Sequence, residues 1–196
     1  MSETTPAIKA LQTANEIMRL FERYGDEDYD GEPVSQASHM IQCAMLAMDH
    51  ACDTELILGA FLHDVGHFLK HEQATEAMGT YGVVNHEGVG AAYLRERGFP
   101  ERICAAVEQH VAAKRYLVAT DADYQKKLSP ASVQTLQWQG GPMSADEVRE
   151  FQQHPYFHDI IKVRFWDEGA KDTKATLLPL SFFRTMIQEY LANSTN

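Results

Sequence analysis

The longest apolar stretch of the chain ends in a charged pair, and this junction most constrains the fold. Residues 56–62 read LILGAFL, and His63 and Asp64 follow them directly. This run is too short to span a bilayer, so it predicts a helix buried in a protein core. A buried carboxylate without a partner costs several kcal/mol, so Asp64 requires a cation beside it. For this dipeptide alone, the alternative is a hydrogen-bonded core histidine followed by an aspartate at a helix end.

Most of the chain shows the 3.6-residue hydrophobic spacing of α-helices, and no segment alternates as a strand does. Helix boundaries are predicted from capping residues and breakers. Predicted helices run from Ser35 to about Ala51, from Asn85 to Gly98, from about Tyr156 to Glu168 and from Phe182 to Leu191. Further helices are predicted to start at Asp53, at Pro100 and at Ser144, which forms a capping box with Glu147. Residues 25–33 form an acidic loop. Without repeats or long linkers, the sequence predicts a single all-α domain over residues 1–196.

The composition is that of an acidic globular protein. The 28 acidic residues outnumber the 17 basic ones, so the net charge is −11 with histidine neutral. Such a surface repels polyanions, so neither nucleic acid nor membrane is expected as a partner. The three cysteines form no CxxC pair, and residues 1–10 carry no export-signal pattern. We therefore expect a cytoplasmic protein with reduced thiols.

Several of the nine histidines lie on predicted helices around the charged pair. On a continuous helix His63 and Asp64 would point about 100° apart, so both could reach one metal from neighbouring angles, or Asp64 could bridge two metals. His67 would share the face of His63. The order His39, His63–Asp64, His86, His110, Asp167 resembles the dinuclear variant of the HD-domain superfamily. The resemblance implies an HD-domain helical bundle. Four imidazoles and two carboxylates suit a pair of first-row transition ions bridged by Asp64.

Five further stretches resemble a narrower group, the small HD-domain di-iron oxygenases that cleave carbon–phosphorus bonds. They are HDVGH, YGVVNHEGVGA, HVAAKRYLV, QGGPM and KVRFWDE, at residues 63–67, 81–91, 110–118, 139–143 and 162–168. The resemblance implies an N-terminal helix and acidic active-site loop in residues 1–34, a metal-binding core in 35–170 and a C-terminal helix in 171–196. It assigns one iron to His39, His63, Asp64 and Asp167, and the other to His86 and His110 with the shared Asp64.

The same resemblance implies the reaction. An Fe(II)/Fe(III) pair would use O2 to cleave the C–P bond of (R)-1-hydroxy-2-(trimethylammonio)ethylphosphonate into glycine betaine and phosphate. The alternative substrate is (R)-2-amino-1-hydroxyethylphosphonate, which gives glycine. An upstream phosphonate hydroxylase would supply the C1 hydroxyl. No organic cofactor is expected, since the chain has no glycine-rich nucleotide fingerprint.

The resemblance also assigns roles around the substrate. Tyr29 matches a loop tyrosine that ligates iron until substrate binds; otherwise its ring only covers the core. Because Lys114 lies one turn after His110, and Arg164 lies one turn before Asp167, both cations should face the metals and the phosphonate. His67 would donate to the same oxygens, so Tyr29, His67 and Lys114 are the expected catalytic residues. The remaining expected substrate contacts are Ser132, Thr135, Gln139, Asp28, Asp30 and Glu32.

An acidic residue after Tyr29 favours the methylated substrate, because a quaternary ammonium is held by charge and aromatic faces. Three rival functions stay open. A metal-dependent HD phosphohydrolase would activate water against a phosphate ester. An inositol-oxygenase-like activity would use similar iron chemistry. A non-enzymatic HD module would bind a ligand without turnover.

Overall fold

The computed structural model describes residues 5–29, 31–71 and 85–194. In these ranges the chain is helical, with no strand and one isolated bridge between Asp28 and Ser35. The predicted all-α class is therefore confirmed. The elements are α1 (Pro6–Tyr24), α2 (Gln36–Asp49), α3 (Thr54–Leu62), the 3₁₀ helix η1 (Val65–His71), α4 (His86–Glu96), α5 (Glu101–Thr120), α6 (Ala122–Lys127), α7 (Pro130–Trp138), α8 (Ala145–Phe151), α9 (Phe157–Gly169) and α10 (Leu180–Asn193).

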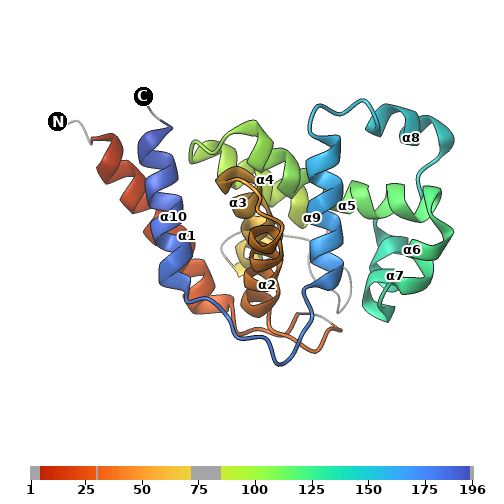
Figure 1. Ribbon diagram of the computed structural model, residues 1–196, viewed down its shortest axis with the longest axis horizontal. Coiled ribbons are helices and arrows are strands. Elements are labelled where there is room, and N and C mark those ends of the chain that lie inside the picture. The colour runs from red at the N-terminus through yellow and green to blue at the C-terminus, as the bar shows by residue number, and fades with distance from the viewer. Residues whose placement is uncertain (1–4, 30, 72–84, 195–196) are drawn as a thin grey trace.

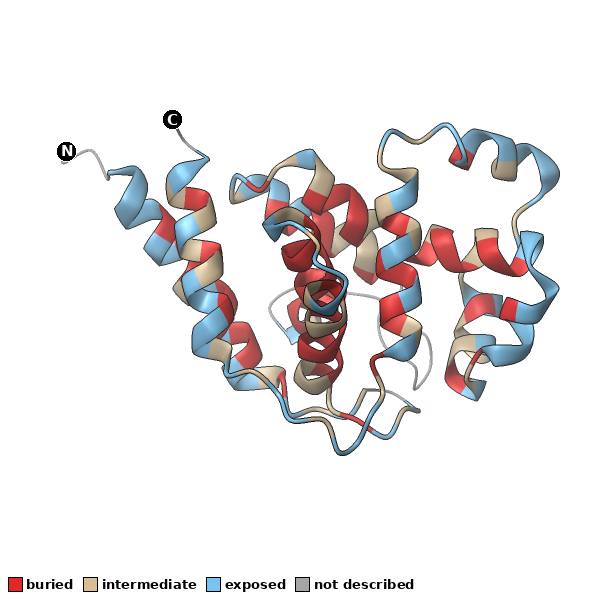
Figure 2. Ribbon diagram, in the orientation of Figure 1, coloured by how far each residue is buried: buried red, intermediate tan, exposed pale blue. Residues whose placement is uncertain are grey.

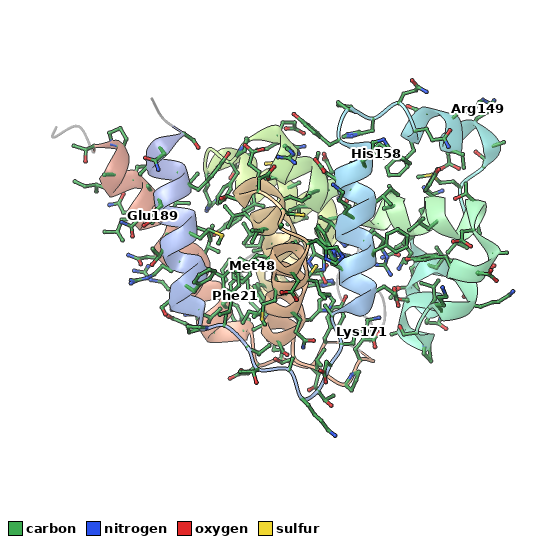
Figure 3. All side chains as sticks on the ribbon, in the orientation of Figure 1. Phe21, Met48, Arg149, His158, Lys171 and Glu189 are labelled. Carbon is green, nitrogen blue, oxygen red and sulfur yellow. The ribbon has the colours of Figure 1, made fainter. Side chains whose placement is uncertain are left out.

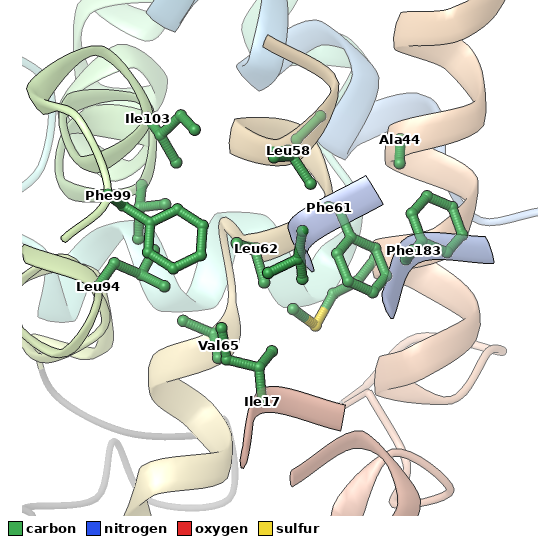
Figure 4. Packing of buried hydrophobic residues seen from close by; sticks show 14 of the residues in the cluster. Ile17, Ala44, Leu58, Phe61, Leu62, Val65, Leu94, Phe99, Ile103 and Phe183 are labelled. Carbon is green, nitrogen blue, oxygen red and sulfur yellow. The ribbon is translucent and has the colours of Figure 1, made fainter. Parts of the chain in front are cut away.

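The first and last helices lie side by side at one end of the molecule (Figure 1). Stacked aromatic rings join them to the centre: Phe61 of α3 stacks on Phe21 of α1 and on Phe183 of α10, with ring centroids 4.6 and 4.1 Å apart. Figure 4 shows Phe61 and Phe183 within the main hydrophobic core. The division at residues 34/35 and 170/171 stays a prediction.

Helix α3 runs through the middle of the core. Every residue from Leu56 to Leu62 is buried, as the apolar run predicted. Figure 2 shows the contrast with α1 and α10, which expose one face along their length. Because its end is also enclosed, α3 carries His63 and Asp64 into the interior, where they are 0% and 2% exposed. No helix among the described residues is both long and apolar enough to cross a membrane.

Three predicted helix starts are confirmed by side-chain caps. Ser35 accepts from the Ser38 N–H (3.3 Å), Asp53 accepts from the Leu56 N–H (3.1 Å), and Ser144 forms a capping box with Glu147. Asn85 occupies the N-cap position of α4, as predicted, but its φ is 58° and its side chain makes no capping hydrogen bond. Pro100 occupies the position before α5 rather than its first turn.

The HDVGH stretch does not continue α3, which corrects the helical prediction for residues 63–67. Helix α3 ends at Leu62, a turn holds His63 and Asp64, and η1 follows. Gly66 explains the change of direction, because a Cβ there would lie 1.9 Å from the His86 carbonyl oxygen. The start of α4 can therefore press against η1. As a result His67 does not share a helix face with His63 and instead faces His86.

Helices α6 and α7 were not predicted individually. Ser129 caps α7 by accepting from the Ser132 N–H (3.1 Å), and Pro130 occupies its first turn. Only Ala131 and Leu136 of α7 are buried, whereas Trp138 is 58% exposed. Helix α7 therefore buries few of its residues, and it lies at the end of the molecule opposite α1 and α10 (Figure 1).

Candidate metal centre

The carboxylate of Asp64 lies between two pairs of histidines. Its Oδ2 is 3.3 Å from His63 Nε2 and 3.7 Å from His39 Nε2. Its Oδ1 is 3.2 Å from His86 Nε2 and 3.3 Å from His110 Nε2. Each oxygen thus faces a different pair, which is the arrangement of a carboxylate that bridges two metal ions.

The first pair comes from α2 and the end of α3, and α9 completes it. His39 and His63 bring their Nε2 atoms within 3.1 Å of each other, and Asp167 Oδ1 lies 3.3 Å from His39 Nε2. Asp167 lies in the last turn of α9. In Figure 3 a group of side-chain nitrogen atoms lies between α2 and α9. All three residues are buried and form one potential metal-binding triad.

The second pair comes from the neighbouring helices α4 and α5. His86 opens α4 and His110 lies in the middle of α5, and their Nε2 atoms are 3.1 Å apart. His67 stacks on His86, with ring centroids 4.0 Å apart, and its Nε2 lies 3.9 Å from Asp64 Oδ1. Asp64, His67 and His86 form a second buried triad. His67, expected as a substrate contact, therefore lies beside the second cluster.

The hydrogen bonds of the histidines show that these clusters suit cations. The Nδ1–H groups of His39, His63 and His110 donate to the carbonyl oxygens of residues 170, 60 and 107, at 3.0, 2.8 and 2.7 Å. A carbonyl only accepts, so each Nε2 of a neutral ring carries a lone pair. The facing Nε2 lone pairs of His39 and His63, 3.1 Å apart, repel unless a cation lies between them. Asp64 Oδ2 is buried without a hydrogen-bond partner, which fits the same conclusion.

Both carboxylates of the centre are held in the charged form. Burial alone would raise the pKa of Asp64, but the neighbouring imidazoles, His63 foremost, lower it well below the usual value. Burial opposes the charge of Asp167 in the same way, and Arg164 lowers its pKa. Imidazole and carboxylate donors suit first-row transition ions. Two buried histidine–aspartate triads thus form a site for two metals.

A small polar cavity of about 50 Å³ lies against this centre. Its lining includes most of the residues predicted to contact substrate: Tyr29, Glu32, His67, Lys114, Ser132, Thr135, Gln139 and Arg164. The ammonium of Lys114 donates to Thr135 Oγ1 (2.9 Å), and the residue is 3% exposed. Burial and the neighbouring Arg164 lower the pKa of Lys114 to about 7. A buried cation with one hydroxyl partner is a ready site for an anion.

Arg164 lines the cavity and also makes contacts that were not predicted. Its Nε donates to the Tyr124 hydroxyl (2.6 Å), and its terminal nitrogens donate to Asp167 and Glu168. Its protein partners therefore fix the guanidinium, which holds Asp167 Oδ2 while Oδ1 faces the histidines. Neither Tyr124 nor Glu168 was predicted from the sequence, because they act through Arg164 and carry no metal-ligand spacing.

The acidic loop contributes to the cavity through two of its predicted residues. The Tyr29 ring stacks on His39, with centroids 4.0 Å apart and planes 14° apart. Burial, together with the charges of Asp64 and Asp167, raises the pKa of Tyr29 well above its usual value. Glu32 also lines the cavity, whereas Asp28 is exposed and does not. Asp30 lies outside the described residues, as do residues 81–84 of the YGVVNHEGVGA stretch.

The cavity also contains unpaired buried polar atoms. Gln139 Oε1, His67 Nδ1 and Gln36 Oε1 have no hydrogen-bond partner. Such atoms are uncommon in folded proteins and indicate a polar ligand or water. Gln36 was not predicted, although its position one turn before His39 on α2 places both on one face. The cavity therefore offers unpaired polar groups to a small polar ligand next to the two histidine–aspartate clusters.

Comparison with known proteins agrees with this geometry. Residues 37–137 match the HD domain family. The chain is 43% identical to the glycine-betaine-forming 1-hydroxy-2-(trimethylamino)ethylphosphonate dioxygenase of Leisingera caerulea, over 86% of this chain and 85% of that protein. It is 36% identical to the hydroxymethylphosphonate dioxygenase of Gimesia maris, over 91% and 88%. An uncharacterized protein of Acanthamoeba polyphaga mimivirus is 41% identical, over 95% and 85%. The chain belongs to the HD-domain family and is related over most of its length to the HD-domain phosphonate dioxygenases.

Proposed function

We propose that this protein is a mixed-valent di-iron dioxygenase that cleaves the C–P bond of (R)-1-hydroxy-2-(trimethylammonio)ethylphosphonate into glycine betaine and phosphate. The observation that carries the proposal is the buried Lys114 in a cavity against the Asp64-bridged histidine clusters. This combination places an anion-binding cation beside a dimetal site. The names of the two dioxygenase relatives make a phosphonate the expected anion.

The proposed ligand sets follow the two clusters. One iron takes His39, His63, Asp64 and Asp167, and the other takes His86, His110 and the shared Asp64. Distances support His110 over His67 in the second set, because their Nε2 atoms lie 3.3 and 3.9 Å from Asp64 Oδ1. Tyr29, stacked on His39, is the proposed ligand that substrate displaces. When bound, the iron pair supplies open positions for the substrate oxygens and electrons for O2.

The residues of this chain bind and orient the phosphonate. Lys114 gives it a charge-assisted hydrogen bond, and Thr135 holds the ammonium in place. Burial and the stacked His86 lower the pKa of His67, so the ring is neutral and its unpaired Nδ1 is free to bond a phosphonate oxygen. Ser132 and Gln139 line the same wall. Arg164 contributes its positive charge and positions Asp167.

The reaction balances with O2 as the only co-substrate. Glycine betaine and phosphate together contain two more oxygen atoms than the hydroxyphosphonate. The C1–H and C–P bonds break, C1 is oxidised to a carboxylate and O2 is reduced. One of the added oxygen atoms ends in the carboxylate and the other in phosphate. An upstream phosphonate hydroxylase remains the proposed source of the substrate, and the cytoplasmic location stays a prediction from the cysteines.

Glu32 supports a cationic substrate. Glu32 lines the cavity, while Asp28 is exposed and does not. A carboxylate in the cavity suits the trimethylammonio group and also the primary amine of (R)-2-amino-1-hydroxyethylphosphonate, which is the alternative substrate. Competition between these two compounds identifies the substrate from their kcat/KM values. Hydroxymethylphosphonate, which has no ammonium group, is the reference. A preference for the unmethylated amine would reverse the choice.

A metal-dependent phosphohydrolase is the rival function, because a dimetal site can also activate water. The position of Tyr29 on His39 favours the oxygenase. The test measures oxygen uptake with the hydroxyphosphonate and phosphate release from phosphate monoesters on the same preparation. Oxygen uptake matched by phosphate and betaine supports the proposal. Phosphate release from esters without oxygen uptake would replace it with the rival.

A further inference from the structure

The proposed substrate carries a cation at the end away from its phosphonate. Among the described residues that line the cavity, Glu32 is the carboxylate outside the metal centre. The wall formed by residues 29 and 32 is the part whose contacts are best defined.

Tyr29 and Glu32 are joined by one tight turn. The Glu32 N–H donates to the Tyr29 carbonyl (2.7 Å), and Gly31 between them has a φ of 80°, which an L-residue rarely adopts. The Tyr29 N–H also donates to the Val34 carbonyl (3.0 Å). Any contact that fixes the Glu32 side chain therefore also restrains the ring that stacks on His39.

Lys171, just beyond α9, makes that contact from behind the cavity wall. Its Nζ lies 2.9 Å from Glu32 Oε1 and 3.0 Å from Glu168 Oε1. The Ser129 hydroxyl also donates to Glu32. The Glu32 and Lys171 side chains are 7% and 15% exposed, so water screens the pair weakly. Figure 3 labels Lys171 at the lower end of α9.

We propose that Lys171 determines how strongly the enzyme prefers cationic substrates, because its ammonium occupies the Glu32 carboxylate until the substrate's own cation replaces it. The inference rests on the proposed function. Glu168 makes the exchange feasible, since it already contacts the Lys171 ammonium and keeps it paired when Glu32 leaves. A phosphonate that lacks an ammonium group gains nothing from Glu32. Lys171 therefore weakens binding of the cationic substrate more than binding of an uncharged one.

The experiment compares two ligands of equal shape. The iron-loaded protein is titrated by calorimetry without oxygen, which prevents turnover. The ligands are (R)-1-hydroxy-2-(trimethylammonio)ethylphosphonate and (R)-1-hydroxy-3,3-dimethylbutylphosphonate, in which a carbon atom replaces the charged nitrogen. The measured quantity is the ratio of their affinities. The variants are Lys171→Met, Glu32→Gln and the double variant, and Lys174→Met is the control because Lys174 is exposed nearby.

Lys171→Met is expected to raise the cation preference about tenfold, the worth of one charge-assisted hydrogen bond. Glu32→Gln should lower it by a similar factor. In the Glu32→Gln background, Lys171→Met should have no further effect, because the two act through one contact. Lys174→Met should leave the ratio unchanged.

Three results would overturn the proposal. An unchanged ratio in Lys171→Met, with both ligands bound, would show that Lys171 does not compete for Glu32. If Lys171→Met raised the affinity ratio equally in the Glu32→Gln background, the effect would come from the overall charge of the site and not from the contact with Glu32. If the wild-type protein binds neither compound, the proposed function fails and the inference fails with it, and this result is distinguishable from the other two.

Discussion

The metal cage and the outer wall of the cavity are held in different ways. The cage consists of His39, His63, Asp64, His86, His110 and Asp167, all at most 4% exposed. Three of its four histidines are fixed by hydrogen bonds from Nδ1–H to backbone carbonyls. Two of these carbonyls belong to α3 and α5, and the third belongs to Ala170, directly after α9, so the helical core holds the cage in place.

The outer wall, formed by the turn of residues 29–32 and by α7, depends on single side-chain contacts. Thr135 of α7 contacts Lys114, and Glu32 of the turn contacts Lys171. Such contacts can change without disturbing the cage. The two dioxygenase relatives are named for phosphonates that differ in the cationic group, at the end of the substrate that this wall would contact. The comparison suggests that the cage determines the chemistry and the wall determines the substrate.

Removal of Asp64 should have the largest effect, because this residue contacts both histidine pairs. We expect Asp64→Ala to lose both metals and all dioxygenase activity. Metal content per chain and oxygen uptake measure this. Asp49→Ala, at the exposed end of α2, is the control and should retain both. Two bound irons with normal turnover in Asp64→Ala would disprove the cage.

We assign His110 to the metal cage and His67 to substrate binding, and the two variants should therefore differ. His110→Ala should lose one metal per chain, since its Nε2 is 3.1 Å from His86 Nε2 and 3.3 Å from Asp64 Oδ1. His67→Ala should keep both metals and bind substrate more weakly. Metal analysis and substrate titration on the two variants separate the roles. The reverse pattern would move His67 into the cage.

Within the cavity, Lys114→Ala should weaken phosphonate binding by about 1.5–3 kcal/mol, the worth of a hydrogen bond to a charged group. Metal content should not change, because the Lys114 ammonium donates its hydrogen bond to Thr135 and not to a residue of the cage. Anaerobic substrate titration gives the affinity. Loss of metal with unchanged affinity would make Lys114 part of the metal centre instead.

The same residue predicts a pH dependence. Because the pKa of Lys114 is lowered to about 7, the ammonium is present below that pH and is lost as the pH rises through it. Phosphonate binding needs the charged form, so kcat/KM should fall above about pH 7. Arginine stays protonated at these pH values. The ratio of wild-type to Lys114→Arg kcat/KM should therefore decline with rising pH, and a constant ratio would exclude Lys114 as the titrating group.

Tyr29→Phe should have the smallest effect on folding and metal content, since it removes only one hydroxyl and keeps the stacking on His39. We expect a faster wasteful reaction with O2 when substrate is absent. Iron spectra before and after substrate addition provide the measurement, with Tyr156→Phe as a control outside the cavity lining. An unchanged spectrum in substrate-free Tyr29→Phe would show that Tyr29 is not a ligand.

Sequence patterns predicted the helical positions and the burial of cage residues better than they predicted the local backbone geometry. The helical positions of His39 and His110 and the burial of His63 and Asp64 followed from periodicity and from the apolar run before residue 63. The turn at His63–Asp64 did not, because it depends on the close approach of the His86 backbone to Gly66, a contact between residues 20 positions apart.

The outer wall was the least predictable region. Lys114 and Thr135 were both predicted as substrate contacts, but their mutual hydrogen bond links α5 to a helix that was not expected. Lys171, Tyr124 and Glu168 escaped prediction because each acts on another side chain and carries no ligand spacing. Glu32 was predicted to contact a substrate cation, and its pairing with Lys171 depends on tertiary packing between the loop and the end of α9.

The most direct test of the central claim is the metal content of the purified protein combined with iron spectroscopy. The proposed function predicts two irons per chain and, in the active form, the signal of a coupled Fe(II)/Fe(III) pair that changes when the hydroxyphosphonate is added without oxygen. A single metal per chain, or two metals of a redox-inactive kind with full activity, would contradict it.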